Sequence, residues 1–282
     1  MTENELKASN PWVEVANMLN PEESDCLYRE QNKDWYVCSK DKERIIDFNK
    51  KCDKDKDYAN CIITNTPPEP WKGNPLHANV IVLSLNPGFS PEINETLAKL
   101  LQSNETIRKG LIEFRRQTLL LEEDSFLPTS EWGSPISIKE AEDMLQGWYW
   151  SKRFKRLIQD SKMEELDVYK RIALIEFHGY SSASSGKSFP IKRKGSASIL
   201  SSQQFIKDMV SFIAKKPDDE VCFIIVRSQN KLNSLLEEIW DKSFFSNKRI
   251  LKDNNGRSQS ITPENIGKGN YDRVLNILKR TK

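Results

Sequence analysis

Apolar residues gather along this chain in three short, largely continuous runs and in a shorter fourth segment, each followed by a polar turn. The runs span Val80 to Leu85, Arg171 to Phe177, Val221 to Val226 and Arg249 to Lys252. Runs that are apolar at consecutive positions, and not only at every second one, are typical of strands buried on both faces. The pattern therefore predicts a mostly parallel central sheet of four strands.

Helical periodicity fills the segments between these runs. Apolar residues recur every three or four positions after Ser90, after Ser201, in the segment that ends at Trp240 and in the segment that ends at Leu278. A long helical stretch from about 105 to 167 reads as an insert. Strands that alternate with helices predict an α/β fold, a three-layer sandwich with helices on both faces of the sheet.

The first 70 residues are polar and lack strong periodicity, so we expect an N-terminal extension (1–70) that wraps an α/β domain (71–282). The prolines between Thr66 and Pro70 mark a stiff entry into that domain. No apolar run approaches the length of a membrane span, and the N-terminus lacks the apolar core of a signal peptide. A cytoplasmic location and no membrane partner are expected.

The sharpest local feature is the turn Asn86-Pro87-Gly88, which stops the first strand abruptly. Ser90 is suited to cap the helix that follows, with Pro91 at its first position. Asn86 is thereby held at the carboxyl end of a buried strand, beside a helix N-terminus, where open α/β sheets bind ligands and anions. The alternative is that this tripeptide is only good turn chemistry.

Charge and cysteines leave other possibilities open. The net charge of +2 neither demands nor excludes nucleic acid, so a DNA-binding surface has to be local. The densest basic stretch, Lys187 to Lys194, is either such a surface or a solvated connection. Four cysteines lie between Cys26 and Cys61, without the two-residue spacing typical of zinc or cluster ligands. Free thiols are favoured over a metal site, and no metal or cofactor is expected.

Polar side chains follow the predicted strands at their carboxyl ends. Asn86 follows the first strand, Glu176 and His178 lie at the end of the second, and a polar loop at 253–265 follows the fourth. Because the carboxyl ends of parallel strands meet at one edge of a sheet, we expect these residues to gather there.

With these residues in place, the sequence resembles a known family. The run from Ser84 to Ser90 is similar to the first motif of the uracil-DNA glycosylase superfamily, closest to its mismatch-specific and thymine-DNA glycosylase branch. The similarity covers roughly Pro70 to Lys279 and leaves the insert at 105–167 unmatched. It implies base flipping followed by hydrolysis of an N-glycosidic bond.

The resemblance assigns roles around the first motif. Asn86 would position and polarise the attacking water, and turnover would be slow because an amide cannot accept a proton. Gly88 stands where strict uracil enzymes carry a bulky aromatic that blocks C5 substituents, so a substituted base would fit. Phe89 would form a stacking wall for the flipped ring, unless it is a core aromatic.

The second strand would supply the residues that contact the base. Glu176 stands where the uracil enzymes carry an Asn; an ionised carboxylate only accepts hydrogen bonds and would favour an exocyclic amine such as cytosine N4. A salt bridge is the alternative role for Glu176. His178 would stabilise negative charge on the leaving base or contact phosphate, unless it is structural. Tyr180 is a further candidate for base binding.

The remaining candidates would contact DNA phosphates or fill the gap left by the flipped base. The late loop lacks the family's Pro-Ser motif, so an ordinary capped turn is the alternative there. The set of phosphate and wedge candidates is Ser90, Lys192, Arg193, Arg257, Ser258, Ser260 and Ile261.

Taken together, the sequence predicts a monomeric, monofunctional DNA glycosylase of uracil-DNA-glycosylase-like fold. Its expected substrate is a modified pyrimidine, a cytosine with a large C5 substituent such as a sugar on phage DNA, which would make it a defence enzyme. Uracil or mismatch repair is an alternative. A non-catalytic nucleic-acid-binding module and an enzyme acting on free nucleosides or nucleotides are the rivals from other classes.

Overall fold

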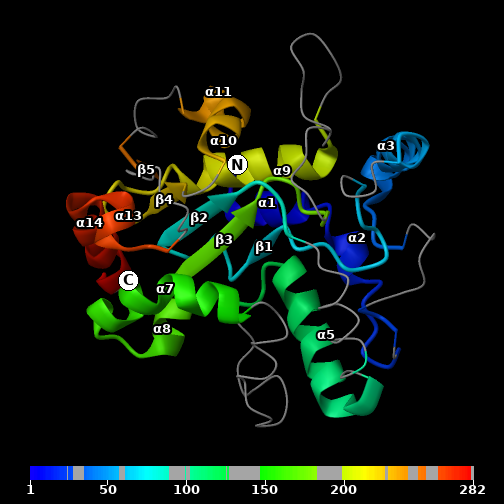
Figure 1. Ribbon diagram of the computed structural model, residues 1–282, viewed down its shortest axis with the longest axis horizontal. Coiled ribbons are helices and arrows are strands. Elements are labelled where there is room, and N and C mark those ends of the chain that lie inside the picture. Colours follow the sequence, from blue (N-terminus) through cyan, green and yellow to red (C-terminus); the bar gives the residue numbers. More distant parts are fainter. Residues whose placement is uncertain are drawn as a thin grey trace.

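The computed structural model places most of the chain in one mixed α/β arrangement (Figure 1). The residues that the structure describes are 1–23, 25–27, 35–56, 61–88, 99, 102–124, 126, 147–182, 199–225, 228–240, 247–251 and 260–280.

The sheet has five strands in the order β1-β3-β2-β4-β5. Its strands are β1 (Trp71–Lys72), β2 (Val80–Ser84), β3 (Ile172–Glu176), β4 (Cys222–Ile225) and β5 (Arg249–Leu251). All four predicted strands are confirmed and pair in parallel. The prediction of four strands is wrong by one, because the two-residue strand β1 adds an antiparallel edge to β3.

Helices precede, connect and follow the strands. They are α1 (Glu3–Ala8), α2 (Val13–Ala16), the 3-10 helix η1 (Ser39–Asp41), α3 (Lys42–Lys54), α5 (Glu105–Leu119), α7 (Gly147–Ser161), α8 (Glu165–Tyr169), α9 (Ser201–Ile213), α10 (Gln229–Leu235), α11 (Glu237–Trp240), α13 (Pro263–Ile266) and α14 (Lys268–Lys279). Within the described part of the chain, no helix combines the length and the apolar character needed to cross a membrane.

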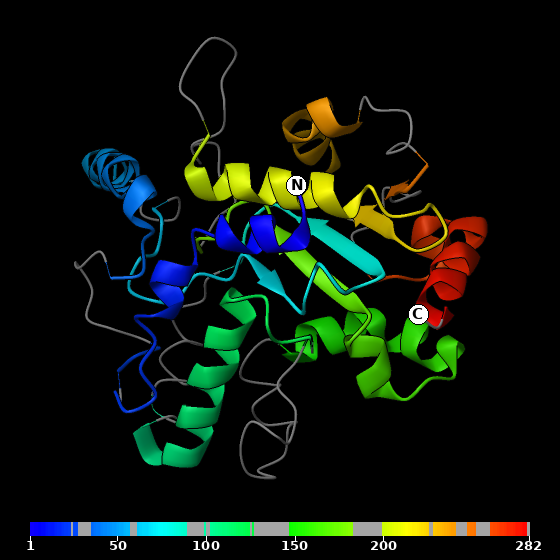
Figure 2. The ribbon, with the colours of Figure 1, turned by 180° about the vertical axis from the view of Figure 1, so that it is seen from behind.

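Alternation along the strands divides the core between the two faces of the sheet. Ile81 and Leu83 of β2 belong to one buried cluster, whereas Val80 and Val82 belong to another. The apolar stripes of α9 and α1 join the first cluster, and those of α7, α8 and α14 join the second. Figures 1 and 2 show α9 and α1 on one side of the sheet and α7 and α8 on the other, which makes three layers.

The N-terminal segment contributes directly to this core. Leu6, Trp12 and Val15 are fully buried in the cluster that also contains Ile81 and Leu83. Asp41 adds a polar link, because its carboxylate accepts hydrogen bonds from the backbone N–H of Ser201 at 2.7 Å and from its hydroxyl at 2.8 Å. An acidic side chain at a helix N-terminus satisfies unpaired N–H groups there, so the segment is fastened to the start of α9.

Candidate active site

Asn86 lies just beyond the carboxyl end of β2, at the switch point of the sheet. β2 pairs with β3 on one side and with β4 on the other, and the chain forms β3 before it crosses over to β4. Open α/β sheets bind ligands at such a point, in the crevice outside the carboxyl ends of the strands. The fold thus puts Asn86 where proteins of this architecture build their sites.

The side-chain amide of Asn86 has a defined orientation. Its nitrogen Nδ2 donates hydrogen bonds to the carbonyl oxygen of Pro87 and to Oγ of Ser182, each at 3.1 Å. A backbone carbonyl only accepts, so the atom that faces Pro87 has to be the nitrogen. The oxygen Oδ1 accepts no hydrogen bond from any described residue. An amide anchored through its nitrogen in this way offers its oxygen as an acceptor for a water molecule.

Ser182 fixes the whole Asn-Pro-Gly turn to the segment that follows β3. Gly88 and Ser182 form a parallel bridge, and the N–H of Ser182 donates to the carbonyl oxygen of Pro87 at 3.4 Å. Ser182 is only 1% exposed. The sequence did not single out this serine, although its place directly after the second predicted strand is a usable signal for a site residue.

Neither packing nor backbone conformation accounts for the glycine at position 88. Gly88 is exposed, its φ lies outside the left-handed region, and an added Cβ would meet no described atom within 4 Å. Gly179 shows the contrast, because a Cβ there would lie 2.5 Å from the ring of Trp12. The open space at Gly88 agrees with the expectation of room for a substituted base, which stays a prediction.

Glu176 ends β3 with its side chain almost fully buried, at 4% exposure. It is in register with Ser84 of β2, and alternation puts it on the same face as Leu174, the face that α7, α8 and α14 cover. Asn86 follows Ser84 by two residues, just beyond the end of β2.

A group of charged side chains surrounds the edge strand next to Glu176. Lys72 forms an ion pair with Glu69 at 3.1 Å, and Arg115 of α5 pairs with the same carboxylate. Burial raises the pKa of Glu69, but the charges of Arg115 and Lys72 outweigh it and hold that pKa at about 2. Burial lowers the pKa of Lys72, against the opposing influence of the carboxylates of Glu69 and Glu176.

His178 is held on the other side, against α9. The side chain of Gln203 contacts Nδ1 of His178, while Oε1 of Gln203 accepts a hydrogen bond from the N–H of Leu200 at 2.8 Å. Gln203 therefore presents its Nε2 as a donor, so Nδ1 of His178 accepts and Nε2 carries the proton. Burial, with a smaller contribution from Lys231, lowers the pKa of His178 to about 3, so the ring is neutral.

Tyr180 is tied to the N-terminal segment. Its hydroxyl accepts a hydrogen bond from the N–H of Cys38 at 3.1 Å and donates to Asp41 at 3.4 Å. Its ring meets Trp12 edge-on, with 5.0 Å between the ring centroids. Burial raises the pKa of Tyr180 well above its usual value. These contacts give Tyr180 a structural function, and base binding by it stays a prediction.

Two of the predicted contact residues in the late loop, Ser260 and Ile261, are described. The carbonyl oxygen of Ser260 accepts a hydrogen bond from the side chain of Asn265 at 2.8 Å. Ile261 is 1% exposed and packs in the cluster of α7 and α14, with its N–H bound to the carbonyl oxygen of Arg153. A wedge has to reach the DNA, so the prediction of Ile261 as wedge is corrected: it is a core residue.

The other predicted contact residues lie outside the described part of the chain. They are Phe89, Ser90, Lys192, Arg193, Arg257 and Ser258. The described residues contain no group of three metal-ligating side chains, and their five cysteines are free thiols.

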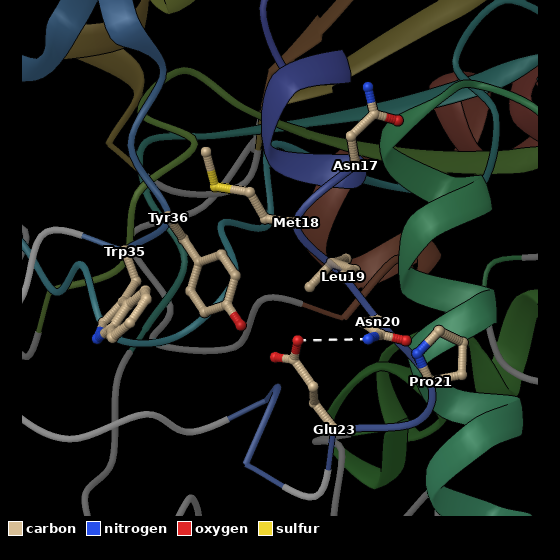
Figure 3. A pocket seen from close by; sticks show the side chains of 8 residues that line it. All are labelled: Asn17, Met18, Leu19, Asn20, Pro21, Glu23, Trp35 and Tyr36. Atoms are coloured by element: carbon tan, nitrogen blue, oxygen red, sulfur yellow. Dashed lines mark hydrogen bonds between the residues drawn. The ribbon is translucent and has the colours of Figure 1, made fainter.

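One pocket, of about 700 Å³, is built from the N-terminal segment (Figure 3). The rings of Trp35 and Tyr36 face residues 17–23 across it, and Asn20 and Glu23 share a hydrogen bond of 3.3 Å. None of the predicted site residues is among those that line it. This pocket could not be predicted from the sequence, because the segment lacks a periodic pattern.

Comparison of the chain with protein-family models, with curated proteins and with solved structures found no match. What the fold and the site define is an α/β protein with an oriented asparagine at its switch point and a partly buried ionic group at the edge strand β1.

Proposed function

We propose that this protein is a monofunctional DNA glycosylase of the uracil-DNA glycosylase type. It flips out a modified pyrimidine and hydrolyses the N-glycosidic bond. The observation that carries the proposal is the orientation of Asn86: its amide nitrogen is used by Pro87 and Ser182, and its oxygen is left to hold a water at the switch point.

In the proposed reaction, Asn86 orients a water through Oδ1 so that its oxygen attacks C1′ of the flipped nucleotide. A bond forms between that oxygen and C1′, and the electron pair of the glycosidic bond leaves with the base. The proton lost by the water passes to solvent, because an amide does not accept it, and the departing base is protonated in turn. The products are an abasic site and a free base.

His178 suits the role of stabilising the leaving base. Gln203 holds the ring in the tautomer that keeps a proton on Nε2, and the low pKa keeps the ring neutral. A neutral imidazole donates a hydrogen bond without repelling other positive charge in the site. This assignment requires that the flipped base reach the carboxyl edge where His178 follows β3.

The substrate is proposed to be a cytosine with a large C5 substituent. Gly88 leaves open space where a side chain would stand, and Glu176 is in register with Ser84, two residues before Asn86. If the substituent is a sugar carried by phage DNA, the enzyme removes a foreign base and serves defence. DNA is the partner in this proposal.

Incubation with a set of modified DNA tests the function. Duplexes and single strands would carry uracil, mismatched thymine, 5-methylcytosine, 5-hydroxymethylcytosine or its glucosylated form, with alkali-labile sites as the readout. We expect strand breaks at the C5-substituted cytosines, which Asn86→Ala abolishes. Asn247→Ala, which changes an exposed asparagine before β5, is the matched control and keeps activity.

Three results would contradict the proposal in different ways. Cleavage at uracil alone removes the modified-cytosine substrate but keeps the enzyme class. Full activity of Asn86→Ala removes the mechanism. Turnover of free nucleosides without any action on DNA replaces the substrate class altogether.

A further inference from the structure

An ionic cluster at the edge of the sheet includes Glu176, the residue proposed to contact the base. We define this cluster as Glu69, Lys72, Arg115 and Glu176. In the antiparallel pairing of β1 with β3, Lys72 faces Leu174, and the N–H of Glu176 donates to the carbonyl oxygen of Pro70 at 2.8 Å. Lys72 and Glu176 are thus diagonal neighbours on one face of the sheet, a spacing that a lysine side chain spans.

The four charges of the cluster sum to zero when both glutamates are ionised. Glu69 is shared by two cations, Lys72 at 3.1 Å and Arg115. The side chains of Lys72, Arg115 and Glu69 are 15%, 16% and 22% exposed, so water screens them weakly. With Glu69 as the one anion, these described side chains would hold an excess positive charge. An ionised Glu176 cancels it and raises the pKa of Lys72, against the larger effect of burial, which lowers it.

We infer that Lys72 is a positioning residue for substrate specificity, which holds Glu176 as a carboxylate so that the site selects pyrimidines with an amine at C4. This inference rests on the proposed function. An ionised carboxylate has four lone-pair sites and no proton. The amine of a cytosine donates to it, whereas the O4 oxygen of a uracil or thymine meets it lone pair to lone pair.

A pair of substrates with the same C5 substituent, one a cytosine and the other a uracil, tests this effect. Duplexes with 5-hydroxymethylcytosine and with 5-hydroxymethyluracil carry the same C5 substituent, and single-turnover excision rates give their ratio. For the wild type we expect a ratio well in favour of the amine. Lys72→Met removes the charge and keeps most of the side-chain length, and we expect it to lower the ratio by about tenfold to hundredfold, the range for a hydrogen bond to a charged group.

Three further variants decide between specificity and simple structural damage. Lys72→Arg keeps the charge and should keep the ratio. Lys207→Met is the matched control. Lys207 lies on α9, on the other face of the sheet; it is 14% exposed and pairs with Glu238 of α11 at 2.7 Å. Glu176→Gln supplies a donor without any change at Lys72, so it should lower the ratio even if Lys72→Met folds poorly.

The outcomes separate this inference from the proposed function. An unchanged ratio in Lys72→Met and Glu176→Gln, with the wild type active, overturns the inference alone. An equal loss on both substrates that Lys72→Arg does not restore overturns it as well, because that pattern reports structural damage. A wild type that excises neither base overturns the proposed function and the inference together.

Discussion

Replacement of Glu69 by Gln should weaken the fold in a way that depends on pH. Glu69 holds the centre of the ionic cluster, with Lys72 and Arg115 as its partners. Although burial raises the pKa of Glu69, the two cations hold it at about 2, against 4.5 in an unfolded chain. A carboxyl whose pKa is lower in the folded state stabilises that state above its unfolded pKa, and this contribution is lost as pH falls toward the folded value.

The magnitude follows from the same shift. Lowering a carboxyl pKa from 4.5 to about 2 corresponds to about 3 kcal/mol at neutral pH. Since 22% of the side chain stays exposed, water screens part of the attraction, and we expect about 2–3 kcal/mol. Gln resembles the protonated carboxyl in shape and charge. The difference between wild type and Glu69→Gln should therefore be complete above about pH 5, shrink below pH 4.5 and be nearly absent at pH 2.

Urea unfolding, followed by tryptophan fluorescence at several pH values between 2 and 7, measures this difference. Glu238→Gln is the control, because Glu238 pairs with Lys207 but is 69% exposed; it should change stability by no more than about 0.5 kcal/mol at any pH. A Glu69→Gln penalty of equal size at pH 7 and pH 3 would refute the reasoning, since it would not come from the carboxylate charge. A penalty near zero at pH 7 would refute it too.

Three other substitutions test the site and its surroundings. Gly179→Ala should lower stability by about 1–3 kcal/mol, because its Cβ would lie 2.5 Å from the ring of Trp12; an unchanged melting temperature would contradict the packing. Gly88→Phe should leave the melting temperature unchanged but suppress excision of C5-substituted bases more than of unsubstituted ones, and equal suppression would count against an open C5 wall. Asn86→Asp should speed single-turnover cleavage, with a rate that rises with pH as the carboxyl ionises, because an aspartate accepts the proton that an amide refuses; a flat pH profile would exclude general-base catalysis.

The sequence predicted the four parallel strands well because three of them are continuous apolar runs and the fourth has the short apolar pair Ile250-Leu251. It missed β1, since two residues, Trp71 and Lys72, carry no period, and their pairing exists only once β3 is present. The burial of Leu6 and Trp12 was also hidden, because short helices show no repeated stripe and depend on tertiary contacts.

The residues of the candidate site also fall into two groups, those proposed from the sequence and those that only the structure shows. Asn86, Gly88 and Glu176 could be proposed from the sequence because a strand end and a turn are local patterns. Their partners were not found, because the contacts join distant parts of the chain: Ser182 meets Asn86 across 96 positions. Gln203 lies within the apolar stripe of α9, where a polar residue reads as an ordinary interruption, and only its contacts with His178 and Leu200 reveal it.

The position of the ionic cluster in the sheet indicates whether it serves stability or ligand binding. Ile172 to Ile175 of β3 are apolar and fully buried, and an apolar residue at position 176 would extend that core without any charge to compensate. Replacing buried ion pairs by apolar side chains often leaves a protein equally or more stable, so stability alone does not favour Glu176. The charge of Glu176 instead lies at the carboxyl end of β3. This strand pairs with β2, whose carboxyl end is at the switch point where a ligand would bind. A buried carboxylate at this position, with Lys72 as its diagonal neighbour, supports the proposed recognition of a base.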